Sequence, residues 1–212
     1  HEWWGNSITT NDIADMWVHE GFCTYAEALY VECIYGYESM LSYVNNQKRN
    51  VRNNMPIIGP YHVNKSGSSD MYFKGSLMLH TLRTIVNDDK LWFEIIMGIS
   101  NDFKYQTIDS EDIIAYINNK SNKDFSNFFE QYLKNNDIPE FVYSLENEGR
   151  NTTLVYKWNA IDDFNMPLLI NTGEKDFWIY PENNLKEIDL GGFDISSFLI
   201  RTDLFYIDVK KQ

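Results

Sequence analysis

The hydrophobic positions follow two different patterns along the chain, and the change falls near residue 138. In the first part, apolar residues recur every three or four positions, which is the spacing of amphipathic helices. Asn11, Asp12, Asp70 and Asp124 stand where side chains cap helix N-termini. We therefore expect six helices, at about 11–33, 37–53, 71–86, 88–100, 110–119 and 125–135.

Two stretches of this first part lack the helical spacing. Residues 1–10 look like the end of a helix, a break at Gly5-Asn6 and a connector. Residues 54–70 hold clustered proline, glycine and serine, which predicts a long irregular loop. A loop of this length inside a compact domain is more often functional than idle.

After Pro139, short runs of alternating polarity replace the helical pattern. Seven strands are expected, at 140–146, 152–158, 166–170, 176–180, 185–190, 197–202 and 204–209. Turn signals separate them, at Glu148-Gly149, Thr172-Gly173, Pro181-Glu182 and Gly191-Gly192. So many short strands in so short a stretch favour a small antiparallel β-sandwich. The predicted fold class is α+β, with a helical domain at 1–137 and a β-sandwich domain at 138–212.

Composition excludes several classes of protein. The chain has 212 residues, of which 43% are hydrophobic and 16% aromatic, so it can bury a sizeable core and is not disordered. The net charge of −13 argues against nucleic acid and anionic membrane surfaces as partners. No run of about eighteen apolar residues is present, so we expect no membrane span.

The two cysteines give no information on the cellular compartment. Cys23 and Cys33 lie ten positions apart in one predicted helix. The helical rise places them ~15 Å apart, beyond the ~7 Å limit for a disulfide. We expect two buried free thiols, and the compartment stays open.

Candidate metal chemistry begins at the first residue. Glu20 follows His1 by nineteen positions, which is the spacing of the second histidine and the distal glutamate in zinc peptidases of the H-E-x-x-H-(x18)-E type. A catalytic zinc takes three protein ligands and a water, and His1 and Glu20 supply two of them. The stretch His1-Glu2-Trp3-Trp4-Gly5 is not itself that motif, because Gly5 stands where a histidine is needed. The general base and the first histidine are then expected upstream of His1, so Glu2 is not a candidate base.

The setting of Glu20 distinguishes it from an ordinary exposed helix carboxylate. It lies in the apolar run Trp17–Phe22, next to Gly21 in mid-helix. Glycine costs about 1 kcal/mol in a helix interior relative to alanine. A close approach by another element, such as a metal-bearing helix, would explain the glycine.

Two further carboxylates are candidates to orient a metal-ligating imidazole. Glu27 follows Glu20 by seven positions, so helical periodicity returns it to nearly the same face. Asp15 is a weaker candidate for the same role. A plain salt bridge is an equally good interpretation of either residue.

Tyr72 is the candidate oxyanion stabiliser. It stands in Tyr72-Phe73-Lys74-Gly75, directly after the long loop. A tyrosine hydroxyl can stabilise the oxyanion that forms during peptide hydrolysis. Only the motif singles it out, since the chain has fourteen tyrosines.

The other histidines need no special role. His80 lies beside Leu79 on a predicted helix and is expected in the core, and His19 and His62 have no partner motif. A Ser-His-Asp or Cys-His site has no sequence context, and no glycine-rich phosphate loop is present. No cofactor-binding residues beyond the zinc candidates are predicted.

These motifs together resemble the zinc aminopeptidases related to aminopeptidase N, especially bacterial members. His1-Glu2-Trp3-Trp4-Gly5-Asn6 matches the family pattern H-x-W-x-G-N, and Trp17–Glu27 matches W-L-x-E-G-F-A-x-Y-x-E. Residues 72–75 match Y-x-K-G, and similarity continues through 76–83 and 124–133. The resemblance therefore covers most of the chain.

The resemblance implies a fold, a cofactor and a mechanism. The fold is the helical lobe of a thermolysin-like catalytic domain, followed by a β-sandwich. His1 and Glu20 are implied as zinc ligands, Glu27 as the following glutamate, and Tyr72 as the residue that stabilises the transition state. The implied reaction is zinc-assisted hydrolysis of N-terminal residues from peptide substrates.

The sequence departs from the family pattern in what it lacks. The first zinc histidine, the glutamate base, the G-x-M-E-N segment that binds the substrate amine and the N-terminal β-domain are not in these residues. We therefore expect a fragment that is inactive alone, with the N-terminal remainder of the same protein as its partner. The alternative is a non-catalytic relative that acts as a binding or scaffolding module. An epoxide hydrolase of the wider family is a third and remote option.

Overall fold

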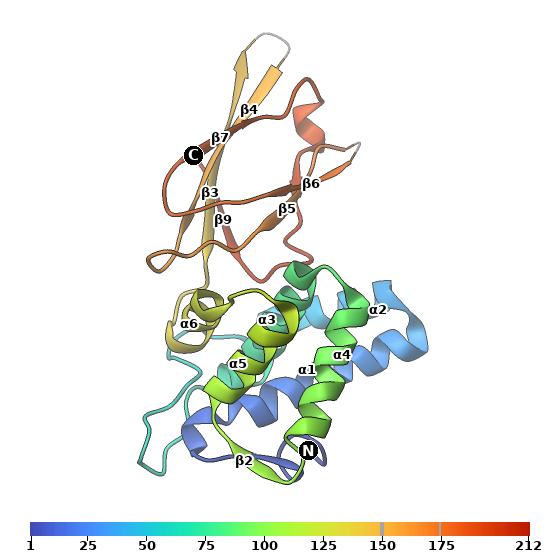
Figure 1. Ribbon diagram of the computed structural model, residues 1–212. Coiled ribbons are helices and arrows are strands. Elements are labelled where there is room, and N and C mark those ends of the chain that lie inside the picture. The colour runs from blue at the N-terminus through green and yellow to red at the C-terminus, as the bar shows by residue number, and fades with distance from the viewer. Residues whose placement is uncertain (149–150, 174) are drawn as a thin grey trace. The chain divides into compact units, whose positions relative to one another are not determined.

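The computed structural model describes residues 1–148, 151–173 and 175–212 of the chain. These residues form two compact units, His1–Asp137 and Ile138–Gln212 (Figure 1). The first unit is mainly helical and the second is built of two small sheets. The predicted α+β class is confirmed. Within the described residues, no helix is long and apolar enough to cross a membrane.

The helices of the first unit follow the predicted order. They are α1 Trp17–Tyr35, α2 Tyr37–Asn46, α3 Phe73–Val86, α4 Asp89–Asp102, α5 Ser110–Ser121 and α6 Ser126–Lys134. Three short 3-10 turns join them: η1 Ile13–Asp15, η2 Gln47–Asn50 and η3 Ser69–Met71. The first helix was predicted to start too early and the second to end too late, because each prediction included a 3-10 turn, η1 before α1 and η2 after α2.

The predicted cap of α3 was wrong. Ser68 caps the η3 turn through a hydrogen bond from the backbone of Asp70. The Asp70 carboxylate instead accepts the backbone N–H groups of Arg52 and Asn53, at 3.0 and 2.7 Å. Asp70 therefore ties the end of η2 to the start of α3, across the long loop.

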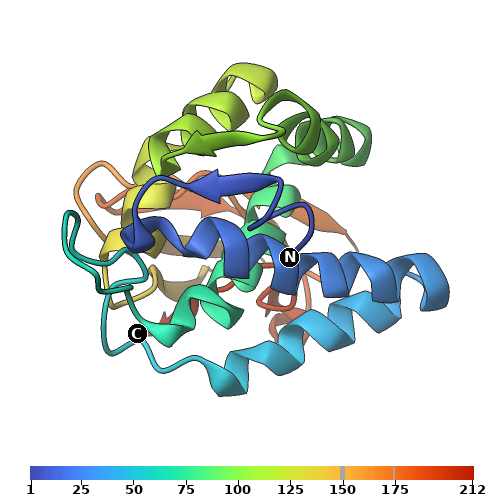
Figure 2. The same ribbon diagram turned by 90° about the horizontal axis from the view of Figure 1, so that it is seen from below.

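The N-terminal residues do not form the end of a helix, as the sequence had indicated. Residues 1–7 form turns, in which Asn6, Ser7 and Ile8 donate to carbonyls five positions earlier. Strand β1, Ile8–Thr10, then pairs in parallel with β2, Gln106–Ile108. Figure 2 shows these two strands side by side. Strands of three residues have no periodicity to detect, so the sequence did not predict them.

The long loop is irregular, as predicted, but it is tightly attached. The N–H groups of Ile57 and Ile58 both donate to the carbonyl of Leu133, and Gly59 donates to Ala14. A Cβ on Gly67 would lie 1.7 Å from the carbonyl oxygen of Ile57, so only glycine permits the loop to fold back on itself.

The core of the first unit is apolar and rich in aromatic side chains. Its largest fully buried members include Trp17, Phe22, Tyr25, Trp92 and Phe129. Trp17 packs between Phe22 and Phe129, with ring centroids 5.8 and 6.1 Å apart. The starts of α1 and α6 are held together through these rings.

The cysteines are free, as expected, but burial was predicted wrongly for one of them. Cys23 is half-buried and Cys33 is exposed. Cys33 lies in the last turn of α1, where the helix leaves the core.

The described part of the second unit contains seven strands, as predicted. They are β3 Glu140–Glu148, β4 Asn151–Asn159, β5 Leu168–Asn171, β6 Asp176–Ile179, β7 Lys186–Asp189, β8 Leu199–Ile200 and β9 Asp208–Lys211, with the 3-10 turn η4 Ile195–Ser197 before β8. The last strand begins at Asp208 and so shares only two residues with the predicted strand 204–209. The sheet orders are β7-β4-β3-β9 and β6-β5-β8. The turn predicted at Glu148-Gly149 falls on residues 149–150, outside the described residues.

The pairing in this unit is not wholly antiparallel. Strand β9 runs parallel to β3, with Glu140 opposite Asp208 and Tyr143 opposite Lys211. The alternating side chains of β4 place Leu154, Tyr156 and Trp158 in the core. The Trp158 indole donates to the carbonyl of Met166 at 2.9 Å. A strand's direction has no signature in its own sequence, so the prediction of an antiparallel arrangement was wrong for β9.

Candidate active site

The N-terminal segment folds back against α1 and carries His1 to that helix. Gly5 has a φ of +127°, and a Cβ there would lie 3.1 Å from the carbonyl oxygen of His1. The Trp4 indole is buried and stacks on Phe22, with ring centroids 5.5 Å apart. The Cys23 thiol donates to the Trp4 carbonyl at 3.4 Å. These contacts of Trp4, Gly5 and Cys23 fix the turn that bears His1.

His1 and Glu20 are in direct contact. The Nε2 atom of His1 lies 2.7 Å from Oε2 of Glu20. The Glu20 side chain is 10% exposed and the His1 side chain is 57% exposed. Glu20 is therefore the buried member of the pair, and His1 faces solvent. The two residues that the zinc spacing singled out therefore lie together in space, with Glu20 in the first turn of α1.

Tyr72 lies at the same carboxylate. It immediately precedes α3, and its carbonyl accepts the N–H of Ser76 at 3.0 Å. Burial raises the pKa of Tyr72, and the charge and hydrogen bonding of Glu20 raise it further. The hydroxyl is thus a neutral donor beside the Glu20 carboxylate.

A contact between two glycines sets the distance between α1 and α3. A Cβ on Gly75 would lie 3.0 Å from the Cα of Gly21. A Cβ on Gly21 would lie 3.2 Å from the carbonyl oxygen of Met71 and 3.3 Å from the Cα of Gly75. The sequence indicated a close approach at Gly21, but expected a metal-bearing helix there. The helix that approaches is α3, which follows Tyr72.

Lys74 anchors the start of α3 from within the core. Its side chain is fully buried, and its Nζ donates to the carbonyls of Asn135 and Asn136 at 3.0 and 2.9 Å. Burial lowers the pKa of Lys74 from 10.5 to about 8. No role for Lys74 is predicted from the sequence. A lysine in the otherwise small and apolar stretch 73–79 was the signal for it.

The structure places Glu27 near the surface. Its Oε2 atom accepts the hydroxyl of Tyr43, from α2, at 2.8 Å. That hydrogen bond raises the pKa of Tyr43. Glu27 therefore links α1 to α2.

Asp15 lies in a separate buried cluster. Its Oδ1 atom accepts the Tyr61 hydroxyl at 2.7 Å and also the hydroxyl of Ser110. Ser110 in turn accepts the Trp17 indole N–H at 2.7 Å. Burial raises the pKa of Asp15. The structure thus brings Asp15 to the long loop and to the start of α5.

The other three histidines, His19, His62 and His80, lie outside the His1–Glu20 contact. His19 accepts the backbone N–H of Thr10 at Nε2, 3.0 Å away, and burial lowers its pKa. The backbone of His62 donates to Asp12 at 2.8 Å. His80 is buried in α3, which agrees with the core position expected from the sequence.

The donor set fits part of a zinc site. An imidazole nitrogen and a carboxylate oxygen are both zinc ligands, and here they converge at one point. Over residues 1–148, 151–173 and 175–212, no three or more His, Cys, Asp or Glu side chains gather as a metal site. The described residues therefore bring together two candidate zinc ligands, His1 and Glu20, of the three protein ligands that a catalytic zinc takes.

The family follows from comparison with known proteins. Residues 1–132 match the peptidase family M1 domain. Because the match spans more than half of the chain, the chain belongs to peptidase family M1. This agrees with the resemblance drawn from the H-x-W-x-G-N and Y-x-K-G motifs.

Individual relatives are similar at a lower level. Aminopeptidase N of Lactococcus lactis subsp. lactis is 25% identical over 158 residues, 66% of this chain and 18% of that protein. Endoplasmic reticulum aminopeptidase 2 of Homo sapiens is 25% identical over 129 residues, 56% of this chain and 13% of that protein.

A solved structure supports the fold. The crystal structure of Legionella pneumophila aminopeptidase A in complex with aspartic acid covers 100% of this chain, with a TM-score of 0.75 and 18% sequence identity. This chain covers 26% of that one. It therefore spans about a quarter of the solved relative, and 18% and 13% of the two curated relatives.

Proposed function

We propose that this chain is part of a zinc-dependent aminopeptidase that removes N-terminal residues from peptides. The observation that carries the proposal is the convergence of His1, Glu20 and Tyr72. These residues come from the N-terminal turn, from α1 and from the start of α3. Membership of family M1 and the names of the similar aminopeptidases support the same reaction class.

His1 and Glu20 would hold the zinc ion, through an imidazole nitrogen and a carboxylate oxygen. A zinc ion there supplies a Lewis acid for the scissile carbonyl and lowers the pKa of a bound water. The third ligand and the general base are proposed to lie in the part of the protein before His1, as the family pattern implies. The share of each relative that this chain covers leaves room for such a part.

Tyr72 would donate a hydrogen bond to the oxyanion. Its raised pKa keeps the phenol protonated at neutral pH, so it enters the reaction as a donor. The influence of Glu20 on the pKa of Tyr72 supports a position of the hydroxyl near the proposed zinc ligand, where it could contact the carbonyl of a peptide.

Glu27 and Asp15 keep supporting roles in this proposal. Tyr43 occupies one oxygen of Glu27, whose other oxygen can orient an imidazole on the same face of α1. Asp15 would act at longer range, by fixing the long loop and α5 to the start of α1.

The test separates metal binding from oxyanion stabilisation in the longer protein that carries this chain. Tyr72→Phe should lower turnover of an aminoacyl substrate by ~10²-fold or more while zinc content stays unchanged. Glu20→Gln should lower both zinc content and turnover, because a charged ligand is lost.

Tyr105→Phe is the matched control, since this tyrosine is 81% exposed, and it should keep wild-type turnover. Near-normal turnover of Tyr72→Phe would remove Tyr72 from the mechanism. If the wild-type protein neither binds zinc nor hydrolyses the substrate, a non-catalytic binding or scaffolding module becomes the better interpretation.

A further inference from the structure

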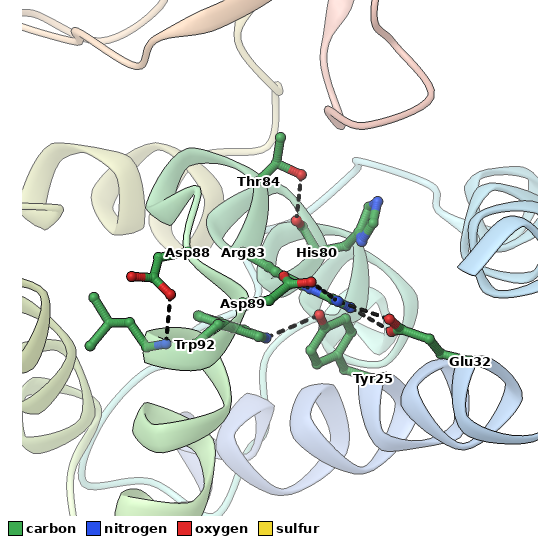
Figure 3. Close-up of polar contacts among 9 residues, drawn as sticks. Tyr25, Glu32, His80, Arg83, Thr84, Asp88, Asp89 and Trp92 are labelled. Carbon is green, nitrogen blue, oxygen red and sulfur yellow. Dashed lines mark hydrogen bonds and ion pairs between the residues drawn. The ribbon is translucent and has the colours of Figure 1, made fainter. Parts of the chain in front are cut away.

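Arg83 forms a buried ionic junction at the far end of α3. Its side chain is 4% exposed. Nη1 and Nη2 donate to the two oxygens of Glu32 at 2.5 and 2.9 Å, and Nε and Nη2 donate to those of Asp89 at 2.8 and 2.9 Å (Figure 3). The two bidentate carboxylates accept four of the five N–H groups of the planar guanidinium, a geometry that a lysine cannot match.

Aromatic rings enclose the same guanidinium. Its Cζ atom lies 5.7 Å from the ring centre of Tyr37 and 5.2 Å from that of Phe93. Beneath it, the Tyr25 hydroxyl accepts the Trp92 indole N–H at 3.2 Å (Figure 3). The Glu32 side chain is 21% exposed, so its ion pair with the buried guanidinium is stronger than a surface pair, whereas the Asp89 side chain is 66% exposed and its pair is screened by water.

The junction joins four helices. The members of the junction are Tyr25 and Glu32 from α1, Tyr37 from α2, Arg83 from α3, and Asp89, Trp92 and Phe93 from α4. Asp89 also lies in the first turn of α4, where a negative charge is favourable. Arg83 is the one group here that contacts α1, α2 and α4 together.

Together with the glycine contact, the junction attaches α3 to α1 at two points. Gly21 meets Gly75, and Glu32 meets Arg83. At 1.5 Å per residue these points are ~16 Å apart on α1 and ~12 Å apart on α3. Their order is the same on both helices, so the two helices run side by side in one direction.

The two attachments have different effects. The glycine contact fixes the distance between the two helices, and Lys74 fixes the start of α3 against the carbonyls of Asn135 and Asn136. Arg83 ties the other end of α3 to α1, which sets the angle between the two helices. A change in that angle would displace Tyr72, which directly precedes α3, and a displacement of about 1 Å at a reacting group is enough to cost ~10²-fold in rate.

We propose that Arg83 is a positioning residue that holds Tyr72 at its place beside Glu20 by fixing the angle between α1 and α3. The inference rests on the proposed function, because it concerns the geometry of that same site. Arg83 itself contacts neither substrate nor metal. Its effect is transmitted through α3.

The test is a double-mutant cycle in the longer protein that carries this chain. Arg83→Lys retains the positive charge and loses the planar guanidinium that binds both carboxylates. Arg83→Lys should lower kcat at least tenfold, with KM within about twofold and zinc content unchanged. In a Tyr72→Phe background the same substitution should lower kcat less than twofold, since no hydroxyl remains to be misplaced. All rates are normalised to folded, zinc-loaded protein.

Two further variants keep the test decisive. Arg201→Lys is the matched control, because Arg201 also binds an aspartate, Asp203, at 2.9 and 2.7 Å, and it should leave kcat unchanged. If Arg83→Lys does not fold, Glu32→Gln replaces it. That variant breaks the link from α1 to α3 while Asp89 still pairs with the arginine.

The outcomes separate this inference from the proposed function. An equal fold loss of kcat with and without the Tyr72 hydroxyl would overturn the positioning role and leave the proposed function standing. A loss that disappears when rates are normalised to the amount of folded protein would do the same. If Tyr72→Phe alone leaves kcat unchanged, the role of Tyr72 fails, and the inference fails with it.

Discussion

At the scale of single residues, spacing in the sequence predicted the closest contact of the site. Nineteen positions separate His1 from Glu20, and their side chains lie 2.7 Å apart. The Arg83 junction was not predicted, because its members come from four helices and no local spacing relates them. The available signal was a charged residue on the apolar face formed by Leu79, Leu82 and Val86.

The buried lysine gives a prediction at this scale. Between pH 8 and pH 10.5 the unfolded chain still protonates Lys74 whereas the folded chain does not, so stability rises with pH across this window. Lys74→Met removes the titration and leaves the carbonyls of Asn135 and Asn136 without this donor. The free energy of unfolding of the 212-residue chain should shift by about 3 kcal/mol in favour of the wild type between pH 7.5 and pH 10.5.

Urea denaturation of both chains at several pH values measures this difference. Tyrosine titration is common to both chains and cancels. A difference in stability that is constant over the window would show that Lys74 titrates at its ordinary pKa.

At the scale of elements, the helices and the seven later strands could be predicted, and the pairing between distant segments could not. The helical spacing and the strand alternation are local properties of the sequence. The pairing of β1 with β2 joins Ile8 to Gln106, and the parallel pairing of β9 with β3 joins Asp208 to Glu140. Both depend on tertiary context that no local pattern records.

The glycine contact between α1 and α3 gives a prediction at this scale. Gly75→Ala gains helix propensity of ~1 kcal/mol, but its Cβ would press on the backbone of Gly21 at 3.0 Å. Overpacking against backbone should outweigh the gain and destabilise the chain by ~1–3 kcal/mol. Turnover in the longer protein should fall as well, because Tyr72 precedes Gly75 by three residues.

Gly98→Ala is the comparison, because the atom in its way is the hydroxyl of Tyr116, at the far end of a side chain that can rotate. Its cost should be smaller. Stability and turnover are measured by urea denaturation and by hydrolysis of an aminoacyl substrate. If the Gly75→Ala variant is as stable and as active as the wild type, then α1 and α3 can move apart without loss of stability or turnover, and the prediction is wrong.

At the scale of the whole molecule, the chain combines a helical unit that bears the site with a separate β unit. The sequence placed the site in the helical part, and His1, Glu20 and Tyr72 all belong to the unit His1–Asp137. Sequence reasoning could not supply what completes the site, because the described residues bring only two metal donors together.

We expect the 212-residue chain by itself to be inactive as a peptidase. Two donors bind zinc weakly, and the proposed base and third ligand are not among its residues. Hydrolysis of aminoacyl substrates should equal that of a metal-stripped sample of the same chain. A rate above that control, abolished by Glu20→Gln, would show that these residues suffice for catalysis.

The parallel pairing of β3 and β9 also determines how the β unit responds to mechanical load. The first and last strands of this unit are neighbours, with four residue pairs from Glu140–Asp208 to Tyr143–Lys211. If the chain is pulled from its two ends, the force runs along both strands in opposite directions. The ladder of hydrogen bonds is then loaded in shear, so its bonds share the force and must break together. If the first and last strands were antiparallel and were pulled from the same two ends, their hydrogen bonds would break one at a time.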